Sequence, residues 1–283
     1  MPLVPNAKLL SAAVDGGYAV PHFNICNLET VQAVAEVMGE LESPVIFGIH
    51  PVESAYAGAD NLVAVISSIV RDTGITAGIH LDHSPTFDEV VRCIRAGYTS
   101  VMFDGSTLPL EENIRTTREV VRVAHLAGVS VEAEIGTIGA TAEYGAEIEN
   151  PHLADPDACA AIGETGIDAL AVAIGNAHGV YIAEPKLDFD RLKAIREKTD
   201  VPLVLHGGSG IPVDQVQRAI KLGVAKFNVG TAIHVSFTSG LRESLAAEPE
   251  SHNMMQHLAF ARERVKPVLR EYVGMAMSEG RAR

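Results

Sequence analysis

The sequence predicts an α/β fold in which eight parallel strands close into a (β/α)8 barrel, and three observations support this fold class. Short apolar runs rich in β-branched residues alternate with helical stretches along almost the whole chain. The alternation repeats eight times within 283 residues. Parallel strands joined by right-handed helical crossovers form a closed barrel at this number of units. No linker interrupts the repeat, so we expect one domain that spans residues 1–283.

The eight expected strands are short and hydrophobic. They are Ala19–Phe23, Val45–Ile49, Ala77–Leu81, Ser100–Phe103, Val131–Ile135, Ala169–Ile174, Leu203–Leu205 and Lys226–Val229. The helices between them are amphipathic; apolar residues between positions 31 and 41, for example, recur at the spacing of one helix face. We expect an extra helix before the first strand, from Ala7 to Val14, and another at the end of the chain, from about His257 to Met277.

The composition argues against several classes of protein. The 36 acidic and 22 basic residues give a net charge of −14, which does not suit a surface for nucleic acid or anionic membranes. No apolar stretch approaches the roughly 20 residues of a membrane span, and the first residues do not resemble a secretory signal. The three cysteines, Cys26, Cys93 and Cys159, are widely spaced and odd in number, as expected for reduced thiols. We therefore expect a cytoplasmic protein.

Ionisable residues stand at the carboxyl ends of several expected strands. Asp82 and His83 end the third strand, Glu134 ends the fifth, His178 follows the sixth, and His206 ends the seventh. In a closed barrel these ends converge on one face, where active sites are built. Burying charged groups is costly unless they are paired or bind a metal. The sequence therefore predicts a site at this face of the barrel.

The three histidines favour a metal centre, because three imidazoles with an open fourth position are the pattern of catalytic zinc. Glu134 is either a fourth or alternating ligand, or a carboxylate beside the ligands. Strict alternation along a strand would place Asp82 and His83 on opposite faces. Both reach the mouth only if the strand ends or bends there. His80 lies on the same face as Asp82 and is better placed to orient its neighbours than to bind the metal.

Two glycine-containing segments predict an anion site next to these histidines. HGGSG, residues 206–210, leads from the seventh strand toward a helix, and FNVGT, residues 227–231, leads from the eighth strand into the next one. Glycines before a helix N-terminus expose backbone N–H groups to an anion, and barrels commonly bind phosphate in the loops after strands seven and eight. A metal and a phosphate would then share one mouth.

The ordered motifs resemble those of the class II, metal-dependent ketose-bisphosphate aldolases of the fructose/tagatose-bisphosphate type, and they are closest in style to the tagatose-bisphosphate branch. The matching segments cover nearly the whole chain and are AVPHFNICNLET, HLDHS, VMFDGS, VEAEIG, LAVAIGNAHG, PLVLHGGSG and KFNVGT. The resemblance implies a carbon–carbon lyase that reversibly cleaves a phosphorylated ketose to dihydroxyacetone phosphate and an aldehyde. It also implies a homodimer or homotetramer.

The family's functional roles carry over to matching positions of this sequence. They make His83, His178 and His206 the ligands of one Zn²⁺ ion, and Asp82 the acid/base that acts on the C4 oxygen. A monovalent cation is also implied near the phosphate. The family roles also make Gly179, Gly207, Gly208, Ser209, Asn228 and Thr231 the binders of dihydroxyacetone phosphate. Beyond these family positions, we expect Asn24, His50, Val229 and Gly230 to contact substrate.

The long loop after the fifth strand, residues 137–156, departs from the family pattern. Loops of this length are usually functional or mobile. The family carries a second base there, usually eight residues beyond the glutamate that corresponds to Glu134. That position is Ala142 in this chain. Glu143 is the expected substitute and Glu147 the alternative.

Other departures lie near the expected substrate. His22 stands where relatives often have alanine and His50 where they often have serine, while Gly230 and Ala232 replace residues that are commonly larger or acidic. If His22 and His50 both face the mouth, opposite the phosphate loops, they change the room and polarity around the aldehyde half. We therefore expect a preference for an aldehyde other than glyceraldehyde 3-phosphate.

Three other functions agree less well with the residues at the strand ends. A Schiff-base aldolase needs a lysine near the carboxyl end of a strand, whereas Lys226 begins its strand and is expected at the opposite mouth. A zinc hydrolase of barrel type typically has an H-x-H pair at the end of the first strand, where this chain has only His22. A non-catalytic aldolase-like partner subunit would not be expected to keep Asp82 together with all three histidines.

Overall fold

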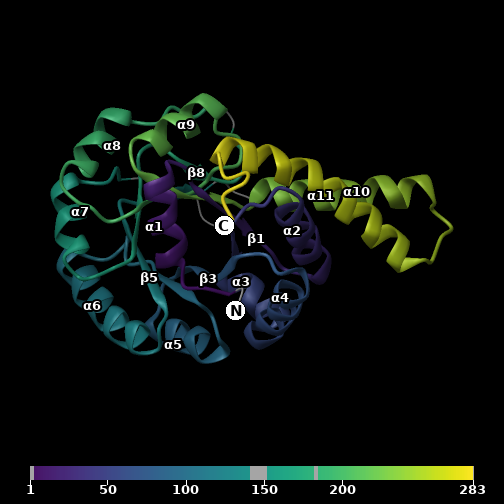
Figure 1. The fold of residues 1–283 in the computed structure, drawn as a ribbon, viewed down its shortest axis with the longest axis horizontal. Coiled ribbons are helices and arrows are strands. Elements are labelled where there is room, and N and C mark those ends of the chain that lie inside the picture. Colours follow the sequence, from purple (N-terminus) through teal and green to yellow (C-terminus); the bar gives the residue numbers. More distant parts are fainter. Residues whose placement is uncertain (1–2, 141–151, 182–183, 283) are drawn as a thin grey trace.

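The computed structural model describes residues 3–140, 152–181 and 184–282, and these contain a closed barrel of parallel strands (Figure 1). The order of hydrogen-bonded strands is β1-β10-β9-β7-β5-β4-β3-β2, which returns to β1. The barrel strands therefore follow the sequence order around the ring, as in a (β/α)8 TIM barrel. The fold class predicted from the sequence is confirmed.

The barrel strands lie close to the expected ranges. They are β1 (Val20–Asn24), β2 (Val45–Ile49), β3 (Ala77–Ser84), β4 (Ser100–Phe103), β5 (Ser130–Ile135), β7 (Ala169–Val172), β9 (Leu203–Leu205) and β10 (Val224–Val229). The bounds of β2, β4 and β9 agree with the predicted ones. A separate two-stranded sheet, β6 (Gly139–Ala140) with β8 (Ala177–His178), covers part of the mouth.

Helices surround the barrel and follow each strand in turn (Figure 1). Several begin at a side chain that caps the first turn, such as Asn27 before α2 and Thr86 before α5. The helices are α1 (Asn6–Gly16), α2 (Leu28–Glu40), α3 (Pro51–Ala57), α4 (Ala59–Thr73), α5 (Phe87–Ala96), α6 (Leu110–Leu126), α7 (Pro156–Gly163), α8 (Phe189–Arg196), α9 (Val213–Lys221), α10 (Thr231–Ala247) and α11 (Met254–Ala276).

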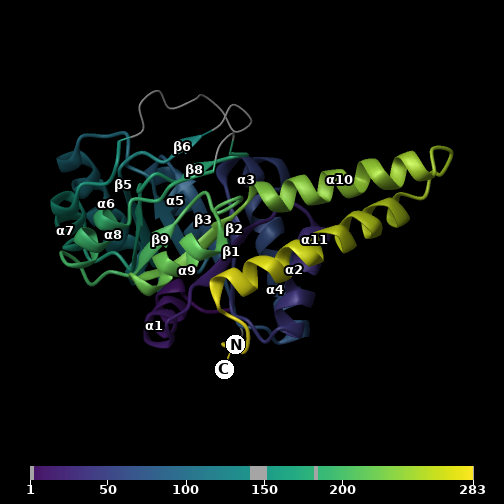
Figure 2. The same cartoon turned by 90° about the horizontal axis from the view of Figure 1, so that it is seen from above.

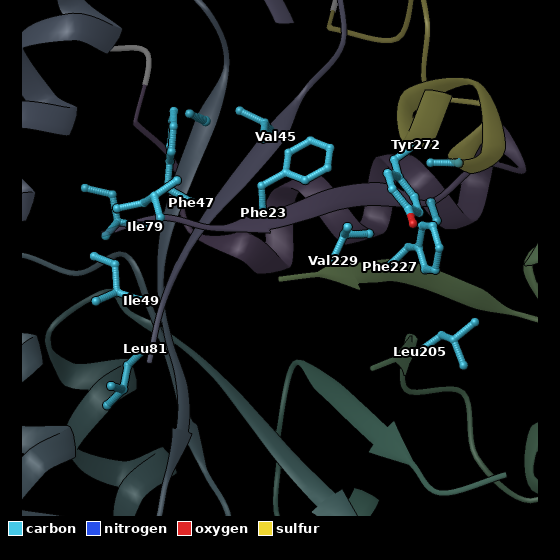
Figure 3. Close-up of a cluster of buried hydrophobic side chains, with 14 of the residues drawn as sticks. Phe23, Val45, Phe47, Ile49, Ile79, Leu81, Leu205, Phe227, Val229 and Tyr272 are labelled. Atoms are coloured by element: carbon cyan, nitrogen blue, oxygen red, sulfur yellow. The ribbon is translucent and has the colours of Figure 1, made fainter. Parts of the chain in front are cut away.

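Odd-numbered residues of most strands point outward and form the core between the barrel and its helices. Figure 3 shows this layer, in which apolar side chains of neighbouring strands lie side by side. The Tyr272 ring of α11 packs 6.0 Å from the ring of Phe227, measured between centroids. This packing fixes the barrel against its outer helices. The labelled strand residues are Phe23, Val45, Phe47, Ile49, Ile79, Leu81, Leu205, Phe227 and Val229.

Even-numbered residues of most strands point into the barrel and make a second, smaller core. Val20, Ile46 and Val204 form its lower layer together with Leu10 of α1. The amphipathic helix α1 therefore closes the end of the barrel where the strands begin, and β6 and β8 lie at the other end (Figure 2). The upper layers carry polar residues, which build the site described below.

Helices α10 and α11 pack against each other and extend away from the barrel as a long hairpin (Figures 1 and 2). Their bases remain joined to the barrel, because α10 begins directly after β10 and α11 packs on α2. The hairpin corresponds to the expected C-terminal helix and the helix before it. Within the described part of the chain, no helix is both long enough and apolar enough to cross a membrane.

Candidate active site

A cavity of about 940 Å³ opens at the carboxyl ends of the barrel strands. Asp82, His83 and His178 line it, together with Asn228 and Glu134. Asp82 and His83 belong to β3, and the other three residues come from β5, β8 and β10, so the closure of the barrel brings them together. The ionisable residues at the strand ends therefore lie around one cavity, as expected from the sequence.

Three imidazole nitrogens meet at the floor of this cavity. The Nε2 atom of His83 lies 3.2 Å from Nε2 of His178 and 2.8 Å from Nδ1 of His206. Ligand atoms each about 2.0–2.1 Å from a zinc ion would lie at comparable separations. The His83, His178 and His206 side chains therefore form a suitable donor set for one metal ion.

A bulge in β3 allows Asp82 and His83 to face the same cavity. Leu81 pairs with Val101, but Ser84 pairs with Phe103, so β3 contains one extra residue at this point. His83 has the left-handed backbone angle φ 52°, and its N–H points at the Met102 sulfur instead of a strand carbonyl. The bend that the sequence requires at the end of this strand is thus produced by the bulge and by the left-handed backbone conformation of His83.

Two carboxylates, the partly buried Asp104 and the fully buried Glu132, hold two of the imidazoles in place. The Nδ1 atom of His83 lies 2.9 Å from Asp104 Oδ2, and Nε2 of His206 lies 2.8 Å from Glu132 Oε1. Each contact occupies the ring nitrogen that does not face the metal position. Carboxylates bound in this way set the tautomer and the ring orientation of a metal ligand. The surroundings of the histidines therefore fit a metal ion as well as the donor atoms do.

Glu132 is itself paired with Lys226 inside the barrel. The Lys226 Nζ atom donates to both oxygens of the Glu132 carboxylate, at 2.8 and 3.1 Å, and both side chains are fully buried. The expectation that Lys226 lies at the opposite mouth was wrong, because its side chain points into the middle of the barrel. Its ammonium group is used in a buried ion pair and does not line the cavity.

Glu134 lies beside one ligand and away from the point where the three nitrogens meet. Its Oε2 atom is 3.7 Å from Nδ1 of His83, on the side of Asp104, and has no hydrogen-bond partner. Burial and the negative charge of Asp104 raise the pKa of Glu134 well above its ordinary value. Glu134 also forms a group of potential metal ligands with His83 and Asp104, so its position keeps both alternatives open: an alternating ligand, or a carboxylate beside the ligands.

The electrostatics suit metal binding at two of the three histidines and oppose it at the third. Burial lowers the pKa of His178 and of His206 well below the ordinary value, so both rings are neutral. Burial also acts against a charge on His83, but the nearby Asp82, Asp104 and Glu134 outweigh it and raise its pKa to about 10. Metal ligands must be deprotonated, so binding of a metal at His83 would release a proton.

Asp82 lies next to the histidines and is held by two amides. Asn24 Nδ2 donates to its Oδ2 atom at 3.0 Å, and Asn228 Nδ2 donates to its Oδ1 atom at 3.3 Å. Burial alone would raise the pKa of Asp82, but the surrounding histidines and Lys226 keep it well below its ordinary value. The carboxylate is therefore ionised and fixed at the edge of the cavity.

The two glycine-containing segments meet at one wall of the cavity. Ser209 Oγ accepts a hydrogen bond from the backbone N–H of Ala232, which joins the loop after β9 to the first turn of α10. Gly230, at the N-cap of α10, provides no side chain to satisfy that end of the helix. A helix N-terminus with free N–H groups attracts anions. The close approach of Gly207 to Ala177 leaves no room for a Cβ atom.

The remaining expected contact residues divide into two groups. Eight of the ten line the cavity: Asn24, His50, Gly179, Gly207, Ser209, Asn228, Gly230 and Thr231. The other two do not. The Val229 side chain belongs to the outer core, and the Gly208 N–H donates to the Asn228 carbonyl at 2.8 Å. Ala142, Glu143 and Glu147 lie outside the described residues.

The two unexpected histidines have different surroundings. His50 lines the cavity, where its Nδ1 atom accepts from the Val52 N–H and caps α3, and burial lowers its pKa. His22 does not reach the mouth as expected; its side chain is fully buried inside the barrel, below Asp82. Its strand, β1, is also the direct neighbour of β10, so it does not lie opposite the phosphate loops.

Asp104 and Glu132, the partners of His83 and His206, were not identified from the sequence. Asp104 follows directly after β4, in the VMFDGS segment, at the same barrel end as Asp82. Glu132 lies two residues before Glu134 and therefore shares its inward direction. Strand-end position and even numbering could have identified both residues. Their partners could not be read from the sequence.

Comparisons with known proteins agree with this geometry. The family model described as fructose-bisphosphate aldolase class-II matches residues 4–281. The chain belongs to the class II fructose-bisphosphate aldolase family. A probable fructose-bisphosphate aldolase of Bacillus subtilis (strain 168) is 43% identical over 270 residues, and the fructose-bisphosphate aldolase of Geobacillus stearothermophilus is 44% identical over 270 residues. Each alignment covers 94% of this chain and 94% of the relative.

Solved structures of aldolases are also similar. The YdjI aldolase of Escherichia coli K12 superposes with a TM-score of 0.88 and 33% identity, covering 99% of this chain and 100% of that one. A Campylobacter jejuni fructose-bisphosphate aldolase has a TM-score of 0.83 at 21% identity, covering 99% of this chain and 97% of its own, and is similar in fold. As a class II aldolase, the protein is a carbon–carbon lyase of a generally metal-dependent family that acts on sugar phosphates.

The contact between Asp104 and His83 generates the first prediction. In Asp104→Asn the carboxylate charge is lost while the side-chain size is kept, so the affinity of the site for zinc should fall by roughly 10- to 100-fold, the usual effect of changing such a partner. Competition with a chromophoric chelator measures the dissociation constant.

A matched control is Asp168→Asn. Asp168 Oδ2 also lies 2.9 Å from a histidine nitrogen, that of His125, but away from the cavity. Its substitution should leave zinc affinity unchanged. Equal zinc affinities for Asp104→Asn and the unmodified protein would mean that Asp104 does not support the ligand.

Proposed function

We propose that the protein is a zinc-dependent aldolase that reversibly cleaves a phosphorylated ketose to dihydroxyacetone phosphate and an aldehyde. The observation that carries the proposal is the placement of the Asp82 carboxylate 3.9 Å from Nδ1 of His206, beside three convergent imidazoles and within one cavity. The name of the family gives the reaction class. The division of roles among the residues is our proposal.

Retro-aldol cleavage requires two kinds of assistance. A base must remove the proton of the C4 hydroxyl group as the C3–C4 bond breaks, and the negative charge left on the ketone half must be stabilised. A divalent metal bound by His83, His178 and His206 would act as a Lewis acid on the ketone oxygen and stabilise this charge. Neutral nitrogen donors in this number are typical of catalytic zinc.

Asp82 is the proposed acid/base for the C4 oxygen. It is ionised, it lines the cavity, and the amides of Asn24 and Asn228 fix both of its oxygens. These contacts limit its rotation, so the carboxylate is oriented before substrate arrives. In the condensation direction the same group would return the proton to the new hydroxyl oxygen.

The wall formed by Ser209, Gly230 and Thr231 is the proposed phosphate subsite. The hydrogen bond between Ser209 and Ala232 joins two loops, so both would present backbone N–H groups to one anion. A phosphate held there would place the ketone half of the substrate toward the histidines. A monovalent cation beside this phosphate belongs to the same proposal.

His50 is the remaining candidate contact for the aldehyde half. Its Nδ1 atom caps α3, so the proton of the neutral ring is assigned to Nε2, which is then a donor. The His50 and His83 rings lie 6.2 Å apart between centroids. Our proposal of a non-standard aldehyde therefore depends on His50 alone, because His22 is buried.

The proposed assembly is a homodimer or homotetramer in the cytoplasm. The α10–α11 hairpin projects from the barrel and exposes large apolar side chains, with Leu245, Met254 and Met255 at 50%, 70% and 76% exposure. Exposed apolar groups of this kind are typical of interaction surfaces. Sedimentation velocity gives the mass in solution.

The central experiment measures release of dihydroxyacetone phosphate from several substrates. These are fructose 1,6-bisphosphate, tagatose 1,6-bisphosphate, ketose phosphates with longer chains, and ketose 1-phosphates that carry no second phosphate. The zinc-loaded protein should cleave at least one of them. Removal of the metal with a chelator should abolish turnover, and zinc or cobalt should restore it.

Full activity in a preparation without measurable metal would overturn the zinc assignment. A zinc-loaded protein that cleaves no ketose phosphate would instead support the non-catalytic partner subunit. The ranking of substrates, compared between the unmodified protein and His50→Ser, would identify the aldehyde half.

Asp82→Asn separates the acid/base role from metal binding. Asparagine keeps the size of the side chain but cannot accept the hydroxyl proton, so kcat should fall by roughly 10²- to 10⁴-fold. Zinc content, measured by mass spectrometry of the purified protein, should remain at the level of the unmodified protein. Loss of zinc together with activity would reassign Asp82 as a ligand.

Glu143 is the proposed second base, which transfers the proton at C3 of dihydroxyacetone phosphate. In Glu143→Gln, exchange of this proton with solvent deuterium should slow by roughly 10²-fold or more, the lower range for a general base. Nuclear magnetic resonance follows the exchange. The comparison variant is Glu147→Gln, and slowing in this variant alone would move the role to Glu147.

A further inference from the structure

Below the catalytic carboxylate, the barrel contains a second cluster of potential metal ligands. It consists of His22, His80 and Asp82, whose ligand atoms all lie within 4.8 Å of one another. The cluster lies inside the barrel, and only Asp82 also lines the cavity. It is therefore separate from the group of His83, His178 and His206.

The histidines of this cluster have unused ring nitrogens. Both nitrogens of His22 and the Nε2 atom of His80 are buried and have no hydrogen-bond partner. Buried polar atoms are nearly always hydrogen-bonded, and exceptions commonly mark a bound water or ion. Three such atoms from two adjacent rings therefore require an explanation that the surrounding protein atoms do not supply.

The barrel makes specific room for the His22 ring. A Cβ atom on Gly48 of β2 would come within 2.1 Å of the His22 ring atoms Cε1 and Nε2. The imidazole thus fills the space that a side chain at position 48 would occupy. The centroids of the His22 and His80 rings are 5.5 Å apart, with an interplanar angle of 83°. One ligand nitrogen of each ring and one Asp82 oxygen lie within 4.8 Å of one another.

The orientation of His80 is fixed from below. Its Nδ1 atom lies 2.8 Å from Ser100 Oγ and 3.4 Å from the side-chain nitrogen of Asn6 in α1. These contacts hold the ring so that Nε2 faces the interior of the barrel. Nε2 approaches Glu132 Oε2 only to 3.6 Å, which is longer than a hydrogen bond.

We propose that His22, His80 and Asp82 form a second site for a zinc-class metal ion, directly below the catalytic carboxylate. Two imidazole nitrogens and one carboxylate oxygen are an ordinary donor set for zinc. Ligand atoms about 2 Å from one ion lie no more than about 4 Å apart, so movements of roughly 1 Å bring the three groups together. The ion would enter from the cavity, past Asp82.

The charges near the cluster make this site weaker than the three-histidine site. Asp82 contributes one negative charge, whereas Glu132 is already paired with Lys226. The Lys226 ammonium group and a metal at the upper site both repel a second cation. The lower site should therefore fill only when zinc exceeds one ion per chain.

Occupation of the lower site would inhibit the enzyme. An ion held by Asp82 would lower the basicity of the carboxylate, so that the proposed acid/base could no longer accept the C4 hydroxyl proton. This consequence depends on the proposed function of Asp82, but the existence of the site does not. Excess zinc should thus reduce turnover while the upper ion remains in place.

The test is a count of bound zinc. The unmodified protein, dialysed against increasing free zinc and analysed by mass spectrometry, should bind one ion per chain and then a second with at least about tenfold lower affinity. Anomalous scattering from a crystal grown at high zinc should place the second ion between the three side chains. The variants His22→Leu and His22→Ala should retain the first ion and lose the second.

Leucine is close to histidine in size and preserves the packing of the barrel if the alanine variant proves unstable. His257→Leu is the matched control, because His257 is also buried but contacts Ser244 far from the cluster. The His257→Leu variant should still bind the second ion. Binding of only one ion by the unmodified protein, or a water between His22, His80 and Asp82 at saturating zinc, would overturn the proposal. Two ions without any inhibition would retain the site and reject only the role of Asp82.

Discussion

The site depends on a single backbone constraint, the left-handed conformation of His83 within the β3 bulge. Two consecutive residues of a regular strand point to opposite faces, so a straight β3 could present only one of Asp82 and His83 to the cavity. With φ at 52°, His83 turns its ring toward His178 and His206 while Asp82 keeps its inward direction. A non-glycine residue in a sparsely populated conformation costs about 1–3 kcal/mol. The surrounding contacts with Asp104 and Met102 offset this cost.

A second requirement is the neutralisation of charge inside the barrel. The Glu132 carboxylate is fully buried, which would be strongly unfavourable for an isolated charge. Lys226 pairs with both oxygens, and His206 uses one of them to fix its ring. A lysine in this position therefore helps to fix the ring of His206, a proposed metal ligand. Its buried pairing also explains why it is unsuited to Schiff-base chemistry, although the sequence reason for that conclusion, its place at the opposite mouth, was wrong.

Most of the architecture could be predicted, because the signal for each strand is local. The ranges of β2, β4 and β9 follow directly from apolar runs bounded by turn residues, and barrel closure then places Asp82, His178 and His206 at one mouth. The bulge could not be predicted, since it depends on how β3 pairs with β4. The burial of His22 was missed for a similar reason. Only the neighbouring strand shows that Gly48 leaves space for the ring.

A series of contacts between polar side chains runs from the closed end of the barrel to the site. Asn6 of α1 approaches His80, His80 lies near Glu132, and Glu132 holds His206. Each contact is made by side chains that are almost completely buried, where weak screening makes orientation matter more than at the surface. An apolar barrel interior would be simpler to stabilise. It would, however, offer no partner for the second ring nitrogen of a histidine such as His206, and the orientation of that ring would not be fixed. The polar middle layer therefore supports the proposed metal ligands, and α1 shields this layer from water at the opposite end.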